Sequence, residues 1–352
     1  MPSARGLSLA ELAQKFLVAV KPDLTPATVS RYEELLRLHV LPTLGGIDAL
    51  KLKRAHLADL YGKLRSEPIA YPQRRADGTQ RVRYGKPLGN TTLLRVHRVI
   101  HAMMEWAVDL ELLPRNVARF GRGKGPKAAP SPARALSAEQ VAEILEAARN
   151  SRQYARYYAF YAVAAASAMR RGEVGALPWA EIDWERSKAE VCQAIGQDRR
   201  GASFIKVPKN GKTRTVKLDP LAIEALRRHR AEQAATKMRN RDRYHDQGLV
   251  FADEFGGILD LDAVSKAFAA IAKSVGIKAK GISLHSCRHF GATEAFADGN
   301  DVRTVAALLG HSDPSTTLRI YGHVVAGAQE RAVASIGNAI RAAQARRAVG
   351  EK

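Results

Sequence analysis

The sequence predicts a mainly α-helical protein with a small antiparallel β-sheet, an α+β fold divided into two domains. Apolar side chains recur at spacings of three and four along most of the chain, which is typical of amphipathic helices. Residues 203–207 and 213–218 alternate instead, and they flank Asn210-Gly211, a dipeptide that favours a β-hairpin. With 352 residues, the chain is long enough for two separate hydrophobic cores.

Residues 1–120 are predicted to form a helical domain. Thr25 and Pro26 suit the N-cap and the first position of a helix that is expected to stop at Pro42. Two further helices are expected at about 54–64 and 90–113, because their apolar residues keep a helical spacing.

Basic residues on this domain are candidate DNA contacts. Arg95 and Arg98 lie on the outer face of the third predicted helix, where phosphate contact and plain solvation are both open. An insertion at residues 66–89 has a hairpin signal at Asp77-Gly78 between arginine-rich arms. This insertion is expected to be a basic ribbon on DNA, a contact with a neighbouring subunit, or a mobile loop.

Residues 121–136 have the composition of a linker, rich in glycine and proline and without an apolar face. The linker carries Arg122, Lys124 and Lys127, which are suited to follow a phosphate backbone. Residues 137–352 form the predicted second domain.

The composition favours a polyanionic partner. The formal charge is +21 and the pI is about 10.2, and the excess is +12 over residues 1–136 and +9 over residues 137–352. Two basic domains are suited to grip one duplex, because each neutralised phosphate releases counterions. Two separated cysteines exclude a disulfide framework and indicate a reducing cytosol. No signal peptide is visible, and the longest apolar stretch is too short to span a membrane at ~20 residues.

Five short motifs carry the chemistry. They combine histidines, arginines, a lysine and a phenol, which together can attack a phosphodiester without a metal ion. Taken singly, each has an ordinary structural explanation: a surface pair, a solvated turn lysine or a buried tyrosine. In chain order they are Met169-Arg170-Arg171-Gly172-Glu173, Lys209-Asn210-Gly211, His285-Ser286-Cys287-Arg288-His289, Leu309-Gly310-His311 and Tyr321.

Two of these motifs have an expected local structure. Arg170 and Arg171 are expected to end the apolar helix that begins near residue 157, with Gly172 allowing a sharp exit. Lys209 is expected at the tip of the hairpin formed by the two alternating segments, and Gly310 suits the position after a helix end.

The ordered set resembles the tyrosine recombinase family, in particular the phage-type integrases. That family has an arginine, a hairpin lysine, His-x-x-Arg-His, Leu-Gly-His and a tyrosine, in this order and at similar spacings. The resemblance covers about residues 8 to 340 and implies a SAM-like helical core-binding domain followed by the recombinase catalytic domain. Ala168, Cys287 and Pro178 depart from common family residues, but no catalytic side chain is missing.

The resemblance implies the site roles. Tyr321 is expected to attack the scissile phosphate and form a 3′-phosphotyrosyl link, with His285 as general base and Lys209 as general acid for the leaving 5′-oxygen. Arg170, Arg288 and His311 are expected to contact the non-bridging oxygens, and Glu173 and His289 to support them. No cofactor and no metal ion are expected.

The resemblance also implies partners. Double-stranded DNA is expected as substrate, bound by a homotetramer on two duplexes, with a monomer or weak oligomer when free and with accessory DNA-bending or directionality proteins. An amphipathic helical segment after residue 324 is expected to join neighbouring subunits or to pack on its own domain. We expect a bacterial, cytoplasmic, nucleoid-associated protein without a membrane contact. A type IB topoisomerase and a non-catalytic DNA-binding protein of the same fold stay as alternatives.

Overall fold

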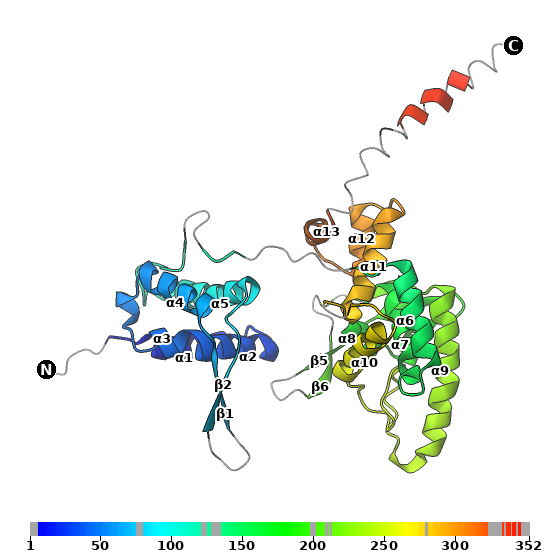
Figure 1. Cartoon of the computed structure of the whole chain (residues 1–352), viewed down its shortest axis with the longest axis horizontal. Helices are drawn as coiled ribbons and strands as arrows, with labels where there is room; N and C mark the ends of the chain where they lie inside the picture. Colours follow the sequence, from blue (N-terminus) through cyan, green and yellow to red (C-terminus); the bar gives the residue numbers. More distant parts are fainter. Residues whose placement is uncertain are drawn as a thin grey trace. The chain divides into compact units, whose positions relative to one another are not determined.

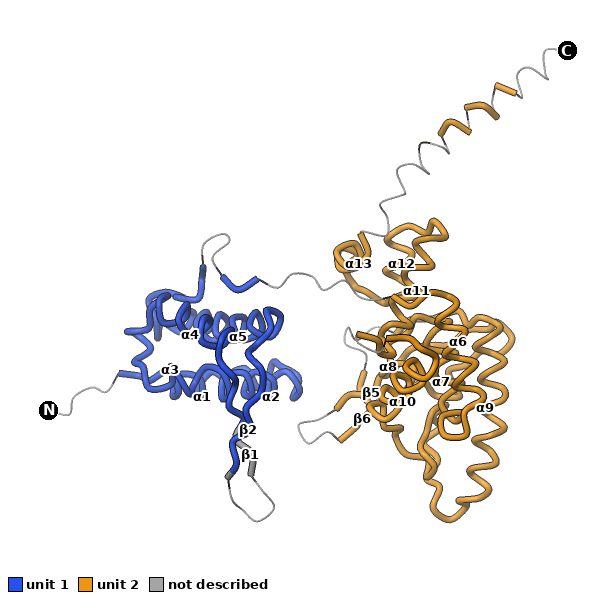
Figure 2. Tube along the Cα trace, in the orientation of Figure 1, with its two compact units in different colours: residues 1–131, 198–201 blue, residues 132–197, 202–352 orange. Residues whose placement is uncertain are grey.

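Two compact units make up the chain, each with its own hydrophobic core: residues 1–131 form one, and residues 132–197 and 202–352 the other (Figure 2). The predicted α+β class, mainly helical with small antiparallel sheets, is confirmed (Figure 1). The computed structural model describes residues 6–74, 80–120, 125–127, 135–197, 202–207, 211, 213–278, 281–322, 333, 336–338, 340–342 and 344–345.

The first unit is built around one long helix, whose apolar stripe is fully buried and packs against the other helices. The expected helices are confirmed, including the N-cap at Thr25, whose side chain accepts from the backbone of Thr28. The helices of this unit are α1 (Leu9–Ala19), α2 (Pro26–Leu35), α3 (Leu41–Leu44), α4 (Arg54–Ser66) and α5 (Asn90–Asp109), with a short 3₁₀ turn η2 (Ala49–Lys51).

The expected stop at Pro42 is wrong. Helix α2 ends at Leu35, but the chain stays helical through the π-helical turn η1 (Leu36–Val40) and into α3. Pro42 falls in the first turn of α3. A proline is tolerated there because the backbone N–H groups of a first turn have no partner within their own helix.

The insertion forms the hairpin that its Asp-Gly signal indicates. Strands β1 (Ala70–Arg74) and β2 (Gln80–Tyr84) pair antiparallel, and the turn between them, residues 75–79, lies outside the described residues. Of the linker cations, Lys127 is exposed, whereas Arg122 and Lys124 lie outside the described residues. Arg95 and Arg98 are exposed on α5, as expected.

The second unit packs its helices around α7, which is buried on nearly all sides and contacts α6, α9 and α11. Helix α6 begins with a capping box in which Ser137 and Gln140 hydrogen-bond reciprocally. The described helices of this unit before its C-terminal segment are α6 (Ala138–Asn150), α7 (Tyr158–Ser167), α8 (Arg171–Gly175), α9 (Pro220–Arg239), α10 (Leu261–Ser274), α11 (Leu284–Ala297), α12 (Val302–Leu309) and α13 (Pro314–Tyr321), with 3₁₀ turns η3 (Ala155–Tyr157), η4 (Trp179–Glu181) and η5 (Arg241–Arg243).

The strands of the second unit pair differently from the prediction. The two segments around Asn210-Gly211 are strands, but their described residues do not pair with each other. The later one joins a three-stranded antiparallel sheet in the order β3-β4-β7, and the earlier one pairs with β5. Lys209, which was predicted at the tip of that hairpin, lies outside the described residues. The strands are β3 (Ile182–Asp183), β4 (Lys188–Val191), β5 (Ala194–Gln197), β6 (Ser203–Lys206) and β7 (Arg214–Lys217).

The described residues of the C-terminal segment are helical, as expected from their amphipathic spacing. Val333, Ile336 and Ile340 are between 55% and 64% exposed. Within the described residues, the helices are all too short or too polar to cross a membrane.

Candidate active site

The first arginine of the motif set lies at a break between two helices. The apolar helix α7 ends at Ser167 rather than at Arg170, because Ala168 takes a left-handed conformation with φ of 51°. Arg170 is the N-cap residue of the short helix α8. Its side chain is 42% exposed, so solvent reaches the guanidinium at the start of α8.

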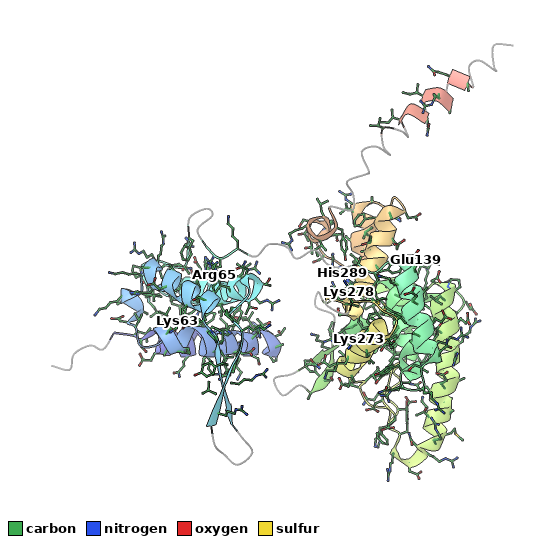
Figure 3. The ribbon with its side chains drawn as sticks, in the orientation of Figure 1. Lys63, Arg65, Glu139, Lys273, Lys278 and His289 are labelled. Carbon is green, nitrogen blue, oxygen red and sulfur yellow. The ribbon has the colours of Figure 1, made fainter. Side chains whose placement is uncertain are left out.

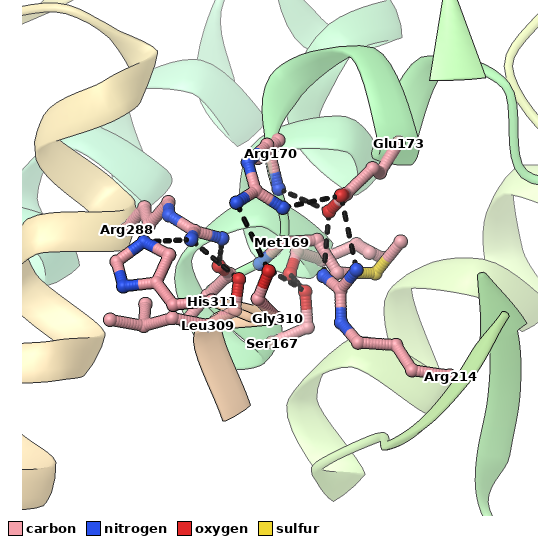
Figure 4. Close-up of polar contacts among 11 residues, drawn as sticks. Ser167, Met169, Arg170, Glu173, Arg214, Arg288, Leu309, Gly310 and His311 are labelled. Atoms are coloured by element: carbon pink, nitrogen blue, oxygen red, sulfur yellow. Dashed lines mark hydrogen bonds and ion pairs between the residues drawn. The ribbon is translucent and has the colours of Figure 1, made fainter. Parts of the chain in front are cut away.

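Glu173 is the buried acid of the site. It is 3% exposed and accepts hydrogen bonds from the backbone N–H and the Nη1 of Arg170, each at 2.9 Å. It also accepts from both terminal nitrogens of Arg214, at 3.0 and 2.6 Å (Figure 4). Burial alone would raise the pKa of Glu173, but the two guanidinium groups outweigh it and lower the pKa to about 2.

Arg288 is buried on α11 and reaches across to main-chain oxygens of two other segments. Its Nη1 donates to the carbonyl of Ala168 at 2.9 Å, and its Nη2 donates to the carbonyl of Leu309 at 2.5 Å (Figure 4). Burial and the neighbouring Arg170 lower the pKa of Arg288 to about 10, so it stays charged at neutral pH.

The end of α12 provides the carbonyls that hold the two arginines. Gly310 caps this helix with φ of 61°, as its sequence position predicts, and the helix therefore stops with free carbonyls. The carbonyl of Gly310 accepts from Arg170 Nη2 at 3.2 Å. Arg170 and Arg288 therefore meet at one turn, directly before His311.

The ring of His311 has a defined tautomer. Arg288 Nη2 lies 3.0 Å from His311 Nε2, and because an arginine can only donate, Nε2 must accept. The ring proton is then on Nδ1, which donates to the buried Thr317 Oγ1 at 2.7 Å. Burial, Arg288 and Arg170 lower the pKa of His311 to about 4, so the ring is neutral at pH 7.

Tyr321 points its hydroxyl at a histidine of α11. The hydroxyl lies 2.5 Å from His289 Nδ1, and the side chain is 4% exposed. Burial raises the pKa of Tyr321 to about 12, only partly offset by Arg288. His289, labelled in Figure 3, has a pKa lowered to about 4 by burial, His285 and Arg288.

His285 lies beside this pair at the exposed start of α11. Its ring is edge-on to the ring of His289, with centroids 4.6 Å apart. Burial, Arg288 and Arg170 lower the pKa of His285. The histidine that contacts the phenol is His289, whereas the resemblance implies His285 as its base.

The structure brings most of the predicted site residues together in the second unit. The set consists of Arg170, Glu173, His285, Arg288, His289, His311 and Tyr321. Arg95 and Arg98 belong to the first unit. Among the described residues, no group of three or more His, Cys, Asp or Glu side chains is arranged to hold a metal ion.

Sequence reasoning missed Arg214. This residue begins β7 and shares the inward face of that strand with the buried Val216, so its side chain is only 18% exposed. A charged residue at an inward position of an alternating strand was the available signal. Its partner could not be found from the sequence, because Glu173 is 41 residues away.

Comparison with known families identifies the chain. The profile of the phage integrase family matches residues 134–327, and that of the phage integrase N-terminal SAM-like domain matches residues 8–65. The chain belongs to the phage integrase family and is an enzyme of the tyrosine recombinase class.

Individual relatives agree with this assignment. A tyrosine recombinase XerC-like protein of Caldanaerobacter subterraneus subsp. tengcongensis is 25% identical over 95% of this chain and 84% of its own length. An integrase of Streptomyces ambofaciens is 24% identical over 90% of this chain and 76% of its own length.

Solved structures share the fold at low sequence identity. A Tn1549 transposon integrase in complex with transposon right end DNA has a TM-score of 0.73 at 16% identity, over 93% of this chain and 99% of that one. A lambda integrase tetramer bound to a Holliday junction has a TM-score of 0.62 at 14% identity, over 89% of this chain and 80% of that one.

Proposed function

We propose that this protein is a site-specific DNA integrase that cuts and rejoins DNA through a 3′-phosphotyrosyl intermediate and a Holliday junction. The observation that carries the proposal is the meeting of Arg170, Arg288 and His311 at the turn after α12. The hydroxyl of Tyr321 is held by His289, the residue that follows Arg288 on α11. Two guanidinium groups and an imidazole fit a phosphate, and a phenol is a nucleophile that conserves the bond energy.

The two arginines divide the phosphate contacts unequally. Arg170 uses one hydrogen on Nη1 and one on Nη2 within the protein, which leaves three N–H groups on a side chain that is 42% exposed. Arg288 is 3% exposed and is fixed by two carbonyls, so it supplies a rigid charge beneath the phosphate. Both would stabilise the charge that develops on the non-bridging oxygens.

Proton transfer accompanies the attack. The oxygen of Tyr321 forms a bond to phosphorus, the bond to the 5′-oxygen breaks, and that oxygen takes a proton from Lys209. The phenol must give up its proton to a base during the attack, because a pKa of about 12 keeps Tyr321 protonated at pH 7. We propose His285 as the general base and His289 as the group that holds the hydroxyl until DNA is bound.

His311 would change partners when DNA binds. In the DNA-free protein its Nε2 accepts from Arg288, so it offers no proton there. A phosphate anion would raise the pKa of this ring, protonate Nε2 and let it donate to a non-bridging oxygen. Glu173 would stay ionised throughout, because its pKa of about 2 lies far below neutrality.

Assembly and DNA contacts complete the proposal. The exposed apolar residues of the C-terminal segment, Val333, Ile336 and Ile340, would bind a neighbouring subunit and build a tetramer on two duplexes. Arg95, Arg98 and the linker residues Arg122, Lys124 and Lys127 would contact phosphates. Accessory DNA-bending or directionality proteins would assist, and the bacterial cytoplasm, where the chromosome lies, would be the compartment.

A nicked suicide duplex carrying the DNA that flanks the gene tests this function. In EDTA, we expect protein covalently attached to the 3′ end, a free 5′-hydroxyl, and Holliday junctions when two intact sites are supplied. Relaxation of supercoiled plasmid of any sequence, without junctions, would indicate a type IB topoisomerase instead. Binding without any covalent attachment would indicate a DNA-binding protein that does not cleave.

A further inference from the structure

Arg214 is enclosed between the buried acid and the turn that bears the phosphate ligands. Both its terminal nitrogens bind Glu173, and its guanidinium lies so close to Gly310 that an added Cβ there would be 2.8 Å from its Cζ and Nη1. Figure 4 shows the Arg214 guanidinium below the Glu173 carboxylate, joined to it by two dashed lines. Arg214 therefore contacts Glu173 and lies against Gly310, the two residues that hold the guanidinium of Arg170.

The hydrogen bonds of Glu173 show what Arg214 does for Arg170. A carboxylate and a guanidinium that meet alone form two parallel hydrogen bonds. Here Arg214 forms the bidentate pair with Glu173. The side chain of Arg170 donates a single hydrogen bond to Glu173, at Oε1. Without Arg214, Glu173 would be free to bind both prongs of Arg170 and draw it off the carbonyl of Gly310.

We propose that Arg214 is a positioning residue that keeps Glu173 from capturing Arg170 and keeps the Gly310 turn in place beneath the phosphate. The inference deepens the proposed function and depends on it for the role of Arg170. Its distinctive consequence is that removing the acid should partly repair the loss of Arg214. A merely structural role predicts at most a recovery of stability in the double variant, because E173Q removes a buried charge that R214A leaves partly unpaired, and it predicts no recovery of phosphate binding.

Four variants of the full chain test the proposal: R214A, R214K, E173Q/R214A and the exposed control R186A. Single-turnover cleavage of the suicide duplex at saturating DNA should fall roughly 100-fold in R214A, as expected for a misplaced catalytic group. R214K keeps the charge but cannot form the bidentate pair with Glu173, so its cleavage rate should stay within about threefold of that of R214A. E173Q/R214A should recover roughly 10-fold over R214A, and R186A should match wild type.

Inorganic phosphate gives a readout that does not need cleavage. Phosphate should raise the melting temperature of wild type and E173Q/R214A, and this rise should be lost in R170A and R214A. Wild-type cleavage by R214A, or a double variant no faster than R214A, overturns the inference. If wild type binds phosphate as expected but never attaches to DNA, the proposed function fails while the effect of Arg214 on Arg170 is supported.

Strands β1 and β2 form a basic ribbon on the first unit, with Arg81 and Arg83 on its second strand. Arg81 and Arg83 alternate with Val82 and Tyr84 on β2, so the two cations share one face of the hairpin, at whose base Tyr71 lies opposite Arg83. All four are exposed, and within the described residues neither arginine forms an ion pair. The base of the ribbon is fixed because Tyr71 packs on the core of the first unit.

We infer that the cationic face of this ribbon binds the backbone of duplex DNA, which adds a contact to the proposed DNA-binding function. Residues two apart on a strand are separated by about 6.8 Å, close to the axial rise of two nucleotides of one DNA strand. Long guanidinium side chains at this spacing, without ion-pair partners among the described residues, can each reach a separate phosphate of the same strand. A second copy of this chain would have to offer acidic groups to these two arginines. The chain has a formal charge of +21, so duplex DNA is the better match.

The salt dependence of binding to a random duplex separates these partners. R81A/R83A should reduce the slope of log K against log salt by about 1.8, whereas R81K/R83K should keep the wild-type slope. An unchanged slope in R81A/R83A overturns the inference. An unchanged slope with weaker self-association in sedimentation would assign the ribbon to a second copy of the chain instead.

Discussion

Lowering the pH from 7.5 to 5 should destabilise the DNA-free protein through two histidines of the site. The folded-state pKa of both His289 and His311 is about 4, below the unfolded value of ~6.5. Between these values the unfolded chain binds more protons than the folded one, so stability rises with pH. The loss therefore begins as the pH falls below ~6.5 and is complete below about 4.

The magnitude follows from the same pKa values. At pH 5, each histidine would lower the free energy of unfolding by about 2 kcal/mol if fully shielded, or about 4 kcal/mol for the pair. Both rings are partly exposed, so solvent screening reduces the expected total to about 2 kcal/mol. Glu173 does not contribute in this window, because its pKa is about 2.

Urea unfolding of wild type and of the non-titrating variant H289Q/H311Q checks this prediction. Other histidines with a lowered pKa, such as His39 and His229, are present in both proteins and cancel in the comparison. Wild type should lose about 2 kcal/mol more than the variant between pH 7.5 and 5. Equal losses in the two proteins would refute the assignment of neutral, desolvated rings at the site.

Three further outcomes are expected. Tyr321→Phe should abolish cleavage but bind DNA within about threefold of wild type in a gel-shift titration, since the lost hydroxyl is one of many contacts; a large loss of affinity would contradict its role as nucleophile. Gly310→Ala should cost about 1–2 kcal/mol in a urea melt and slow cleavage, because φ is 61° and the new Cβ overlaps Arg214; a stable, fully active variant would show that the turn tolerates displacement. DNA binding at pH 6 should take up protons, because phosphate raises the pKa of His311, and calorimetry in two buffers of different ionisation enthalpy measures the uptake; no uptake would place the phosphate elsewhere.

Local signals in the sequence were sufficient where one short segment determines its own structure. Thr25 and Gly310 cap helices as their positions predict, because a cap depends on residues within one turn. The motif order also identified the residues that gather around the turn after α12. Both results use information that is contiguous in the chain.

Contacts between distant segments could not be derived in this way. Arg214 and Glu173 are 41 residues apart, and His289 and Tyr321 are 32 apart, so no spacing rule pairs them. The hairpin expected around Asn210-Gly211 was wrong because both flanking strands found partners earlier in the chain. The end of α7 at Ala168 could not be predicted, because alanine rarely takes a left-handed conformation and is not a helix-terminating residue.

The most direct test of the account is the identity of the amino acid that becomes joined to DNA. After trapping on the suicide duplex, nuclease and trypsin digestion followed by mass spectrometry should find a 3′-phosphonucleotide on the peptide that contains Tyr321, and the Tyr321→Phe protein should give no adduct. An adduct on any other residue, or an undiminished adduct in that variant, would contradict the arrangement of phenol, histidines and arginines described for this site.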